Sequence, residues 1–207
     1  MKQSILIITL VFSLLTTHLV QADPPSFSYV ELEYIAAGDF EISDGSLSVD
    51  VDIDGYALNA SVELGIFILQ ASRFELESET VFDSNLEDSI STLALGLAFE
   101  LPRTQLYGLI RGRRDELSLR GGGFDEDEDA NSIGFELGAR VNLTDWLEIN
   151  ANFGKPAVDE GDSYGVGAQF FITKNLGITL DFSSIEVEDD DITGKFDTTS
   201  VGLRYSF

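Results

Sequence analysis

The fold is decided most clearly by a stretch in which every second residue is apolar. It runs Ile133-Gly134-Phe135-Glu136-Leu137-Gly138-Ala139-Arg140-Val141-Asn142-Leu143. Successive side chains of a β-strand point to opposite faces, whereas an amphipathic helix needs apolar residues three and four positions apart. The stretch therefore predicts a strand with one apolar face and one polar face.

The same alternation recurs in both directions along the chain, and no long segment keeps a helical spacing. Ten strands are expected, at 28–38, 54–64, 66–77, 89–100, 105–117, 131–142, 146–154, 163–172, 175–186 and 197–207. Proline lacks the amide donor that a sheet needs, and the four prolines fall outside all ten segments. The prediction is an all-β chain.

The connections between these segments alternate between short and long. The short ones are Gly65, 101–104, 143–145 and 173–174, and the long ones are 39–53, 78–88, 118–130, 155–162 and 187–196. This order predicts a closed antiparallel up-and-down barrel. Most segments have the roughly 9–11 residues with which a tilted strand crosses a bilayer. In such barrels short turns face the periplasm and long loops face outside.

Negative charge is concentrated in the long connections and the strand tips beside them. The chain carries 37 acidic and 12 basic residues, a formal net charge of −25, and windows 39–54, 75–88, 115–130, 155–162 and 186–197 hold 28 of the 37 acids. Such a polyanion repels phosphate, so nucleic acid is excluded as a main partner. The extracellular loops are expected to be acidic.

Two kinds of closed barrel fit the alternation. A soluble barrel has its apolar face inside, whereas a membrane barrel has lipid outside and a polar interior. The polar faces mix Gly, Asn and Ser with opposite charges, which favours a confined lumen over a solvated surface. The expected lumen charge cluster is Glu63, Glu100, Arg111, Glu136, Arg140, Asp181 and Arg204.

The first 22 residues have the features of an export signal. Lys2 precedes an apolar run at 5–15, and Val20-Gln21-Ala22 places small residues at −3 and −1 of a cut after Ala22. The expected organisation is a cleaved signal peptide, 1–22, and a single barrel domain, 23–207. An uncleaved membrane anchor is the alternative.

The last residues of the chain have a pattern that resembles a known family of proteins. The terminal Leu203, Tyr205 and Phe207 alternate with Gly202, Arg204 and Ser206. With the signal peptide and the Gly-containing strands, this is similar to the small outer-membrane β-barrel proteins of Gram-negative bacteria, the porin-like and outer-membrane protein A-type barrels. The resemblance implies an outer-membrane monomer in contact with the bilayer and lipopolysaccharide, and an assembly signal at Leu203, Tyr205 and Phe207. Many barrels of the family have eight strands, so eight is the alternative count.

Aromatic residues fall mostly near the expected strand ends, where membrane barrels carry interfacial girdles. They are Tyr29, Tyr34, Tyr107, Trp146, Tyr164 and Tyr205. Ordinary strand propensity is the simpler explanation of their positions.

The amino-acid types present in the chain exclude several kinds of catalytic site. The chain has no Cys, and its one histidine, His18, lies in the expected signal peptide. Catalysis by histidine-containing triads or by thiolate is therefore excluded for residues 23–207, and neither an enzyme nor a cofactor is expected. Asp50, Asp52 and Asp54 precede Gly55 as in the first half of a calcium loop, but Ser61 stands where that loop has a bidentate Glu. Loosely bound Ca²⁺ or Mg²⁺ is the most that this pattern predicts.

Three functions remain open at this point. A structural or porin-like barrel, including a narrow pore that prefers cations, follows from the lumen charges and the acidic mouth. A surface binding or adhesion module, whose acidic loops bind divalent cations or lipopolysaccharide, is the alternative. A soluble periplasmic barrel is the third.

Overall fold

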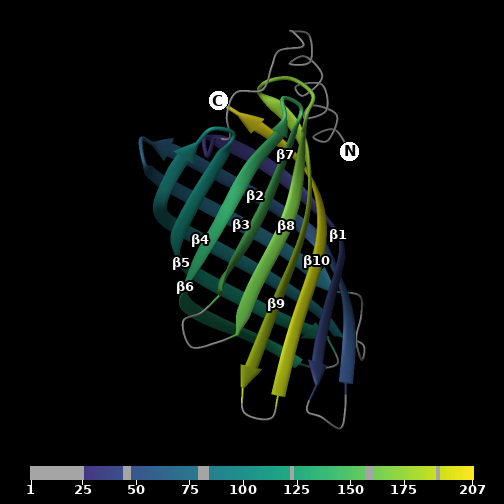
Figure 1. Ribbon diagram of the computed structural model, residues 1–207. Coiled ribbons are helices and arrows are strands. Elements are labelled where there is room, and N and C mark those ends of the chain that lie inside the picture. The colour runs from purple at the N-terminus through teal and green to yellow at the C-terminus, as the bar shows by residue number, and fades with distance from the viewer. Residues whose placement is uncertain (1–25, 44–47, 79–83, 122–123, 157–160, 190–191) are drawn as a thin grey trace.

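The computed structural model describes residues 26–43, 48–78, 84–121, 124–156, 161–189 and 192–207. Within these ranges ten strands form a closed barrel in which each strand runs antiparallel to both neighbours (Figure 1). They are β1 (Tyr29–Ser43), β2 (Ser48–Leu64), β3 (Phe67–Ser78), β4 (Ser84–Leu101), β5 (Thr104–Gly121), β6 (Phe124–Thr144), β7 (Leu147–Lys155), β8 (Asp162–Phe171), β9 (Leu176–Asp189) and β10 (Ile192–Ser206). The described residues include no helix that is long and apolar enough to cross a membrane.

The first and last strands close the barrel. β1 pairs with β2 on one side and with β10 on the other, so that Leu32 lies opposite both Leu58 and Leu203. One irregularity interrupts the β1–β10 ladder between Ile35 and Ala37. The strand count of ten is confirmed, and the alternative count of eight is wrong.

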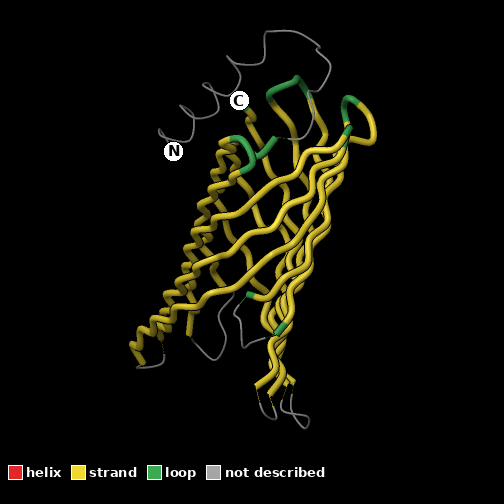
Figure 2. The backbone as a smooth tube through the Cα atoms, turned by 60° about the vertical axis from the view of Figure 1, so that its left-hand side comes forward, coloured by secondary structure: helices red, strands yellow, loops and turns green. Residues whose placement is uncertain are grey.

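The strands are longer than the sequence pattern predicts. β6 has 21 residues, and Arg120 pairs with Asp125 across the β5–β6 hairpin, so most of the expected loop 118–130 belongs to these strands. Asp39 likewise pairs with Asp52 between β1 and β2. These acidic stretches lie outside the alternating segments and were therefore expected to be loops, but the hydrogen-bond ladder of each hairpin continues through them. Figure 2 shows strands continuing at the end of the barrel opposite the C-terminus.

The short connections lie where they were expected. β2 and β3 are separated by Gly65 and Ile66, β4 and β5 by Pro102 and Arg103, and β6 and β7 by Asp145 and Trp146. The connection from β8 to β9, residues 172–175, is also short. The first described residues, 26–28, and the C-terminal Phe207 lie at this end of the barrel, called here the short-turn end (Figure 1). The opposite end is called the hairpin end.

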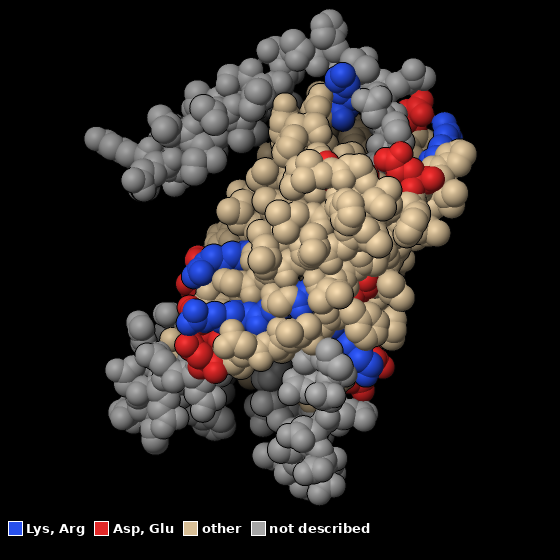
Figure 3. Space-filling view, turned by 90° about the vertical axis from the view of Figure 1, so that its left-hand side faces the viewer, with Lys and Arg blue, Asp and Glu red and all other residues tan. Residues whose placement is uncertain are grey.

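Large apolar side chains cover the outside of the barrel. Leu58, Leu93, Ile110, Ile133 and Val201, from five different strands, are each 45–66% exposed. Figure 3 shows a broad band of the surface nearly free of charged residues, with charged atoms gathered at its margins. An exposed apolar surface of this extent fits contact with hydrocarbon.

The interior is polar, the inverse of a soluble barrel. Glu31, Gln105, Arg140, Glu148 and Arg204 are all less than a tenth exposed. Two small apolar clusters interrupt this lining, one around Phe27 and Ile68 and the other around Ile35 and Leu76. The arrangement favours the membrane barrel over the soluble one.

Two aromatic residues lie elsewhere than the girdle pattern suggested. Tyr34, Trp146, Tyr164 and Tyr205 are exposed on the outer surface, whereas Tyr29 and Tyr107 pack inside against the Phe27 cluster. Both share the inward parity of their strands with acidic or amide residues such as Glu31 and Gln105. Parity along the strand, rather than distance from the strand end, therefore determines the side on which each aromatic residue lies.

A row of polar residues marks the margin of the apolar band on the hairpin side. Arg73 of β3 lies opposite Ser91 of β4, which lies opposite Arg114 of β5. Arg73 is 3.2 Å from Glu75, and Arg114 is 3.0 Å from Asp129, with all four side chains more than half exposed. Such exposed pairs contribute little to stability. Their position shows where the apolar outer surface ends.

Candidate functional site in the barrel lumen

A segment that precedes the first strand occupies the lumen at the short-turn end. Phe27 is 3% exposed and packs against Ile68, Ala94, Ala98 and Leu109 of β3, β4 and β5. Its backbone N–H donates to Oε2 of Glu63 at 3.0 Å, and the backbone N–H of Glu63 donates to Oγ of Ser28 at 3.1 Å. The segment is thus joined by two hydrogen bonds to Glu63 of β2.

Aromatic and cationic groups surround the Phe27 ring. Tyr107 meets it edge-to-face with ring centres 4.9 Å apart, and the guanidinium of Arg140 lies 4.8 Å from its centre. Nη1 of Arg140 also donates to the carbonyl oxygen of Ser26 at 2.7 Å. We call Ser26, Phe27 and Ser28 the lumen plug, because they lie inside this end of the barrel in contact with its wall.

Two buried ion pairs lie beside the plug. Nη2 of Arg140 is 2.7 Å from Oε1 of Glu148, and Nη2 of Arg204 is 2.7 Å from Oε2 of Glu31, with all four side chains less than a tenth exposed. Gln169 accepts a further hydrogen bond from Arg204 at 3.1 Å. The Tyr29 ring lies 4.2 Å from the Arg204 guanidinium and 5.9 Å from that of Arg140. These pairs satisfy charges that would be very costly if buried alone.

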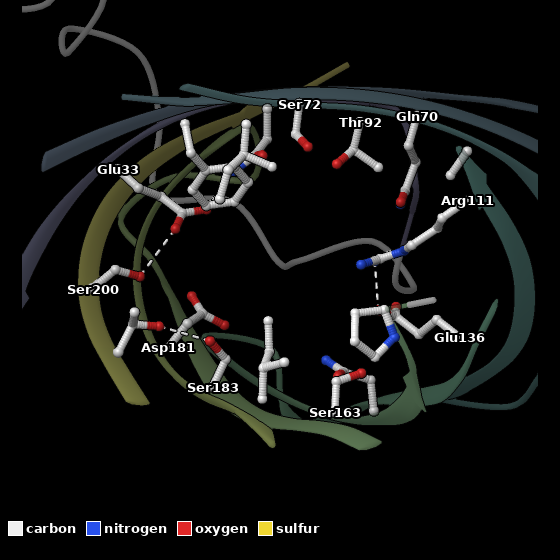
Figure 4. A pocket seen from close by; sticks show the side chains of 18 of the residues that line it. Glu33, Gln70, Ser72, Thr92, Arg111, Glu136, Ser163, Asp181, Ser183 and Ser200 are labelled. Carbon is white, nitrogen blue, oxygen red and sulfur yellow. Dashed lines mark hydrogen bonds and ion pairs between the residues drawn. The ribbon is translucent and has the colours of Figure 1, made fainter. Parts of the chain in front are cut away.

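Beyond these pairs, toward the hairpin end, the lumen holds a cavity of about 330 Å³. Glu33 and Asp181 lie on one side of it, and Arg111 lies beside Glu136 on the other (Figure 4). Arg111 is 2.5 Å from Glu136. Hydroxyl and amide side chains complete much of the wall, among them Ser72, Thr92, Asn150 and Ser200. The volume is at the low end of the range, about 300–1,000 Å³, that small-molecule sites occupy.

The two carboxylates on the first side receive hydrogen bonds from uncharged groups. Glu33 accepts from Nδ2 of Asn59 at 2.5 Å and from Oγ of Ser200 at 2.9 Å. Asp181 accepts from Nδ2 of Asn150 at 3.3 Å. The three arginines Arg111, Arg140 and Arg204 are instead bound to Glu136, Glu148 and Glu31. This side of the cavity therefore holds two acidic groups that none of the described ion pairs includes.

Six of the seven lumen residues expected from the sequence lie in this region. Glu63 binds the plug, Asp181 lines the cavity, and Arg111, Glu136, Arg140 and Arg204 form ion pairs. Glu100 is the exception: it is exposed next to the turn that follows β4, and none of the described ion pairs includes it. It lies at the rim because its strand ends at the following residue.

The sequence analysis did not name Glu31, Glu33 or Phe27 as residues of the lumen. Glu31 and Glu33 alternate with Leu32 and Tyr34, so the period-two pattern could have placed both in the lumen. Phe27 had no such signal, because it precedes the first strand. Its position depends on contacts that no local pattern encodes.

Two of the three residues of the expected calcium pattern have described side chains, and neither points into the barrel. Asp52 and Asp54 belong to β2 and are exposed, while the side chain of Asp50 lies outside the described residues. No group of three or more acidic, His or Cys side chains that could hold a metal ion occurs among the residues searched, which are the described ones.

The terminal motif lies at the seam of the barrel. Tyr205 pairs with Val30, and Leu203 pairs with Leu32. The backbone N–H of Phe207 donates to the carbonyl oxygen of Ser28, which joins the end of the chain to the lumen plug. Ala22 lies outside the described residues.

The barrel is similar to several solved outer-membrane structures. The outer membrane protease OmpT from Escherichia coli matches with a TM-score of 0.58 and 12% identity over 93% of this chain and 100% of that chain. The translocator domain of the autotransporter NalP from Neisseria meningitidis matches with a TM-score of 0.51 and 10% identity, over 100% of this chain and 95% of that chain. The β domain of the Bordetella autotransporter Brka matches with a TM-score of 0.51 and 11% identity, over 87% of this chain and 99% of that chain. No protein-family model and no curated protein matches the chain. The fold is that of outer-membrane β-barrels.

Proposed function

We propose that the protein is exported to the outer membrane of a Gram-negative bacterium and spans it with its ten strands. The short-turn end faces the periplasm, and the acidic hairpins face the outside. The apolar outer band, the polar lumen and the fold shared with outer-membrane proteins support this placement. Its surroundings would be the bilayer and lipopolysaccharide, and Leu203, Tyr205 and Phe207 would be read by the barrel-assembly machinery. We expect a monomer.

The barrel in this proposal is closed at rest, and its role is structural or in binding at the cell surface. The observation that carries this is the lumen plug: Phe27, tied to Glu63 and Arg140, fills the short-turn end. A closed end prevents free diffusion through the lumen, while the cavity on the other side of the plug stays accessible from outside. The role is therefore that of a surface barrel and not of a constantly open pore.

Single-channel recording tests the proposal. The full chain purified from the membrane fraction should give no discrete conductance steps in a planar bilayer, while heat-modifiable migration on a gel shows that it is folded. The Phe27→Ala variant should give steps, because the ring that fills the lumen is gone. Steady steps from the unaltered protein would overturn the closed barrel.

A gated path for cations is the second candidate. The cavity holds two acidic groups, Glu33 and Asp181, that none of the described ion pairs includes. In their ionised form they would attract cations once the plug moved. The steps of Phe27→Ala should then be cation-selective, with a reversal potential under a salt gradient that shifts when Asp181 is replaced by Asn. Occasional steps of the unaltered protein with the same selectivity would favour this candidate.

The acidic hairpins support a binding role of a different kind. Carboxylates such as Asp52 and Asp54 on the outer surface could collect Ca²⁺ or Mg²⁺ and link to lipopolysaccharide phosphates through these ions. A melting temperature that rises with Ca²⁺ and falls again with chelator would support such binding. No catalytic role is proposed, because residues 23–207 contain no His or Cys.

A further inference from the structure

The strand register brings together the two acidic groups of the cavity that none of the described ion pairs includes, Glu33 and Asp181. Ser200 lies directly opposite Asp181 in the β9–β10 ladder, and its hydroxyl donates to Glu33 of β1 at 2.9 Å. Glu33 itself pairs with Gly202, two residues along β10 from Ser200, so Glu33 and Asp181 lie on either side of β10 with an offset of two residues. Their side chains both point toward the cavity (Figure 4).

A glycine leaves space for one of the two carboxylates. Gly167 lies opposite Asp181 in the β8–β9 ladder, and a Cβ at this position would collide with Oδ1 of Asp181. Any other residue here would force the carboxylate to move. The Asp181 carboxyl group therefore occupies space that is open because residue 167 has no side chain. It is not held there by an ion pair with a described basic residue.

Three further basic residues line the cavity, and each is paired with an acidic residue. Arg111 is 2.5 Å from Glu136. Arg113 is 2.6 Å from Asp115, and Lys155 is 3.5 Å from Asp162. A ligand that carries a negative charge would meet two acidic groups on one side and basic groups that already have acidic partners on the other. The cavity therefore selects a cation.

The number and kind of oxygen atoms around this side of the cavity favour an organic cation over a metal ion. Ca²⁺ takes 6–8 oxygen ligands, usually from several carboxylates, and no metal-holding group of three or more acidic, His or Cys side chains occurs in the described residues. An ammonium group has three donors. These match the acceptors that Glu33, Asp181 and Ser200 present around one side of the cavity.

Apolar side chains lie next to this charged pair. Ile35 follows Glu33 by one inward step on β1, and it packs with Leu76 and Ile90, with Phe74 and Phe196 against them. All five residues line the cavity. An apolar surface beside two carboxylates fits a molecule with an ammonium head and a hydrocarbon stem.

We propose that the cavity binds a small aliphatic amine, with the ammonium group between Glu33 and Asp181 and the hydrocarbon stem against Ile35, Leu76 and Phe74. The inference rests on the proposed function in one respect, since the ligand enters from the hairpin end while the plug closes the other. The protein would then capture amines from outside the cell.

Three probes with the same stem test the chemistry: n-butylamine, n-butanol and butyrate. Binding to the full, detergent-solubilised chain is followed by ligand-observed NMR, which detects weak complexes. We expect saturable binding of the amine alone. Equal binding of the alcohol, or stronger binding of butyrate, would overturn the proposal. Displacement of the amine by Ca²⁺ would also overturn it, because the two carboxyl groups would then form a metal site.

Variants locate the site. Glu33→Gln and Asp181→Asn should each weaken butylamine binding about tenfold or more, the range expected for a lost charge-assisted hydrogen bond. Asp54→Asn is the matched control, because this acid is exposed on the outer surface. Heat-modifiable migration shows that each variant is folded. Amine affinity unchanged in both lumen variants would overturn the site.

The two proposals fail separately. Conductance of the unaltered protein would overturn the closed barrel, yet amine binding that depends on Glu33 and Asp181 would survive that result. A silent bilayer with no amine binding would leave the closed barrel intact and overturn only the ligand.

Discussion

The Arg140 guanidinium lies 4.8 Å from the centre of the Phe27 ring and is bound at the same time to Glu148 and to the carbonyl oxygen of Ser26. One side chain thus joins the wall of the barrel to the segment that fills its lumen. The planar guanidinium makes this possible, because its donors point in several fixed directions while its face lies against a ring. A lysine would retain the charge but not this combination of contacts.

Arg140→Lys should therefore loosen the lumen plug without unfolding the barrel. The chain has no cysteine, so Ser26→Cys places a unique thiol in the plug. Labelling of this thiol by a water-soluble maleimide should be about tenfold faster in the Arg140→Lys background, corresponding to the loss of one charge-assisted hydrogen bond. Lys174→Cys, exposed in the β8–β9 turn, should be labelled equally fast in both backgrounds. Identical slow labelling of Ser26→Cys in both would contradict the role of Arg140.

The buried pair Arg204–Glu31 should contribute far more to stability than the exposed pair Arg73–Glu75. Glu31→Gln leaves a buried guanidinium without its counter-charge, so we expect a loss of about 3–5 kcal/mol of unfolding free energy. Glu75→Gln should cost no more than about 1 kcal/mol, because water screens that pair. Urea titrations of the folded barrel in detergent, followed by gel migration, measure both. Similar losses for the two variants would show that the Arg204–Glu31 pair is open to water.

The Tyr107 ring covers Gly138, its cross-strand partner in the β5–β6 ladder. A Cβ at residue 138 would collide with this ring, and the same ring packs edge-to-face on Phe27. Gly138→Ala should therefore destabilise the barrel by about 1–3 kcal/mol through overpacking and displace the plug. Gly112→Ala is the control, since its Cβ would come no closer than 3.9 Å to any neighbouring atom. The same urea titration compares the two, and an unaffected Gly138→Ala protein would show that Tyr107 can turn away freely.

The architecture was predictable because it depends on a local signal. Alternation in stretches such as 133–143 requires strands, and a polar face of Gly, Asn and paired charges indicates a lumen. The ends of the strands were less predictable. The acidic residues 125–129 have low strand propensity, yet they pair with 116–120 because a hairpin ladder satisfies their backbone groups.

The identity of the ion pairs was not predictable. Glu31 and Arg204 face each other directly in the ladder that closes the barrel, and they are 173 residues apart in sequence. Alternation assigns each residue to a face but does not fix the register between the first and last strands. Phe27 was missed for a related reason, since a residue outside every strand has no face to be assigned to.

The single tryptophan offers a direct test of how the barrel lies in the membrane. Trp146 is in the β6–β7 turn, 56% exposed, and stacks on Phe170 with ring centres 6.3 Å apart. If the apolar band spans the hydrocarbon, this turn lies at headgroup level, where Trp is preferred. Lipids labelled with a quencher near the headgroup should therefore quench Trp146 more strongly than lipids labelled deep in the acyl chain. Leu95→Trp in a Trp146→Phe background moves the probe to an outward position in the middle of β4, and the order of the two quenchers should reverse. Without quenching at either position the outer surface would face water, and the membrane-spanning interpretation would be wrong.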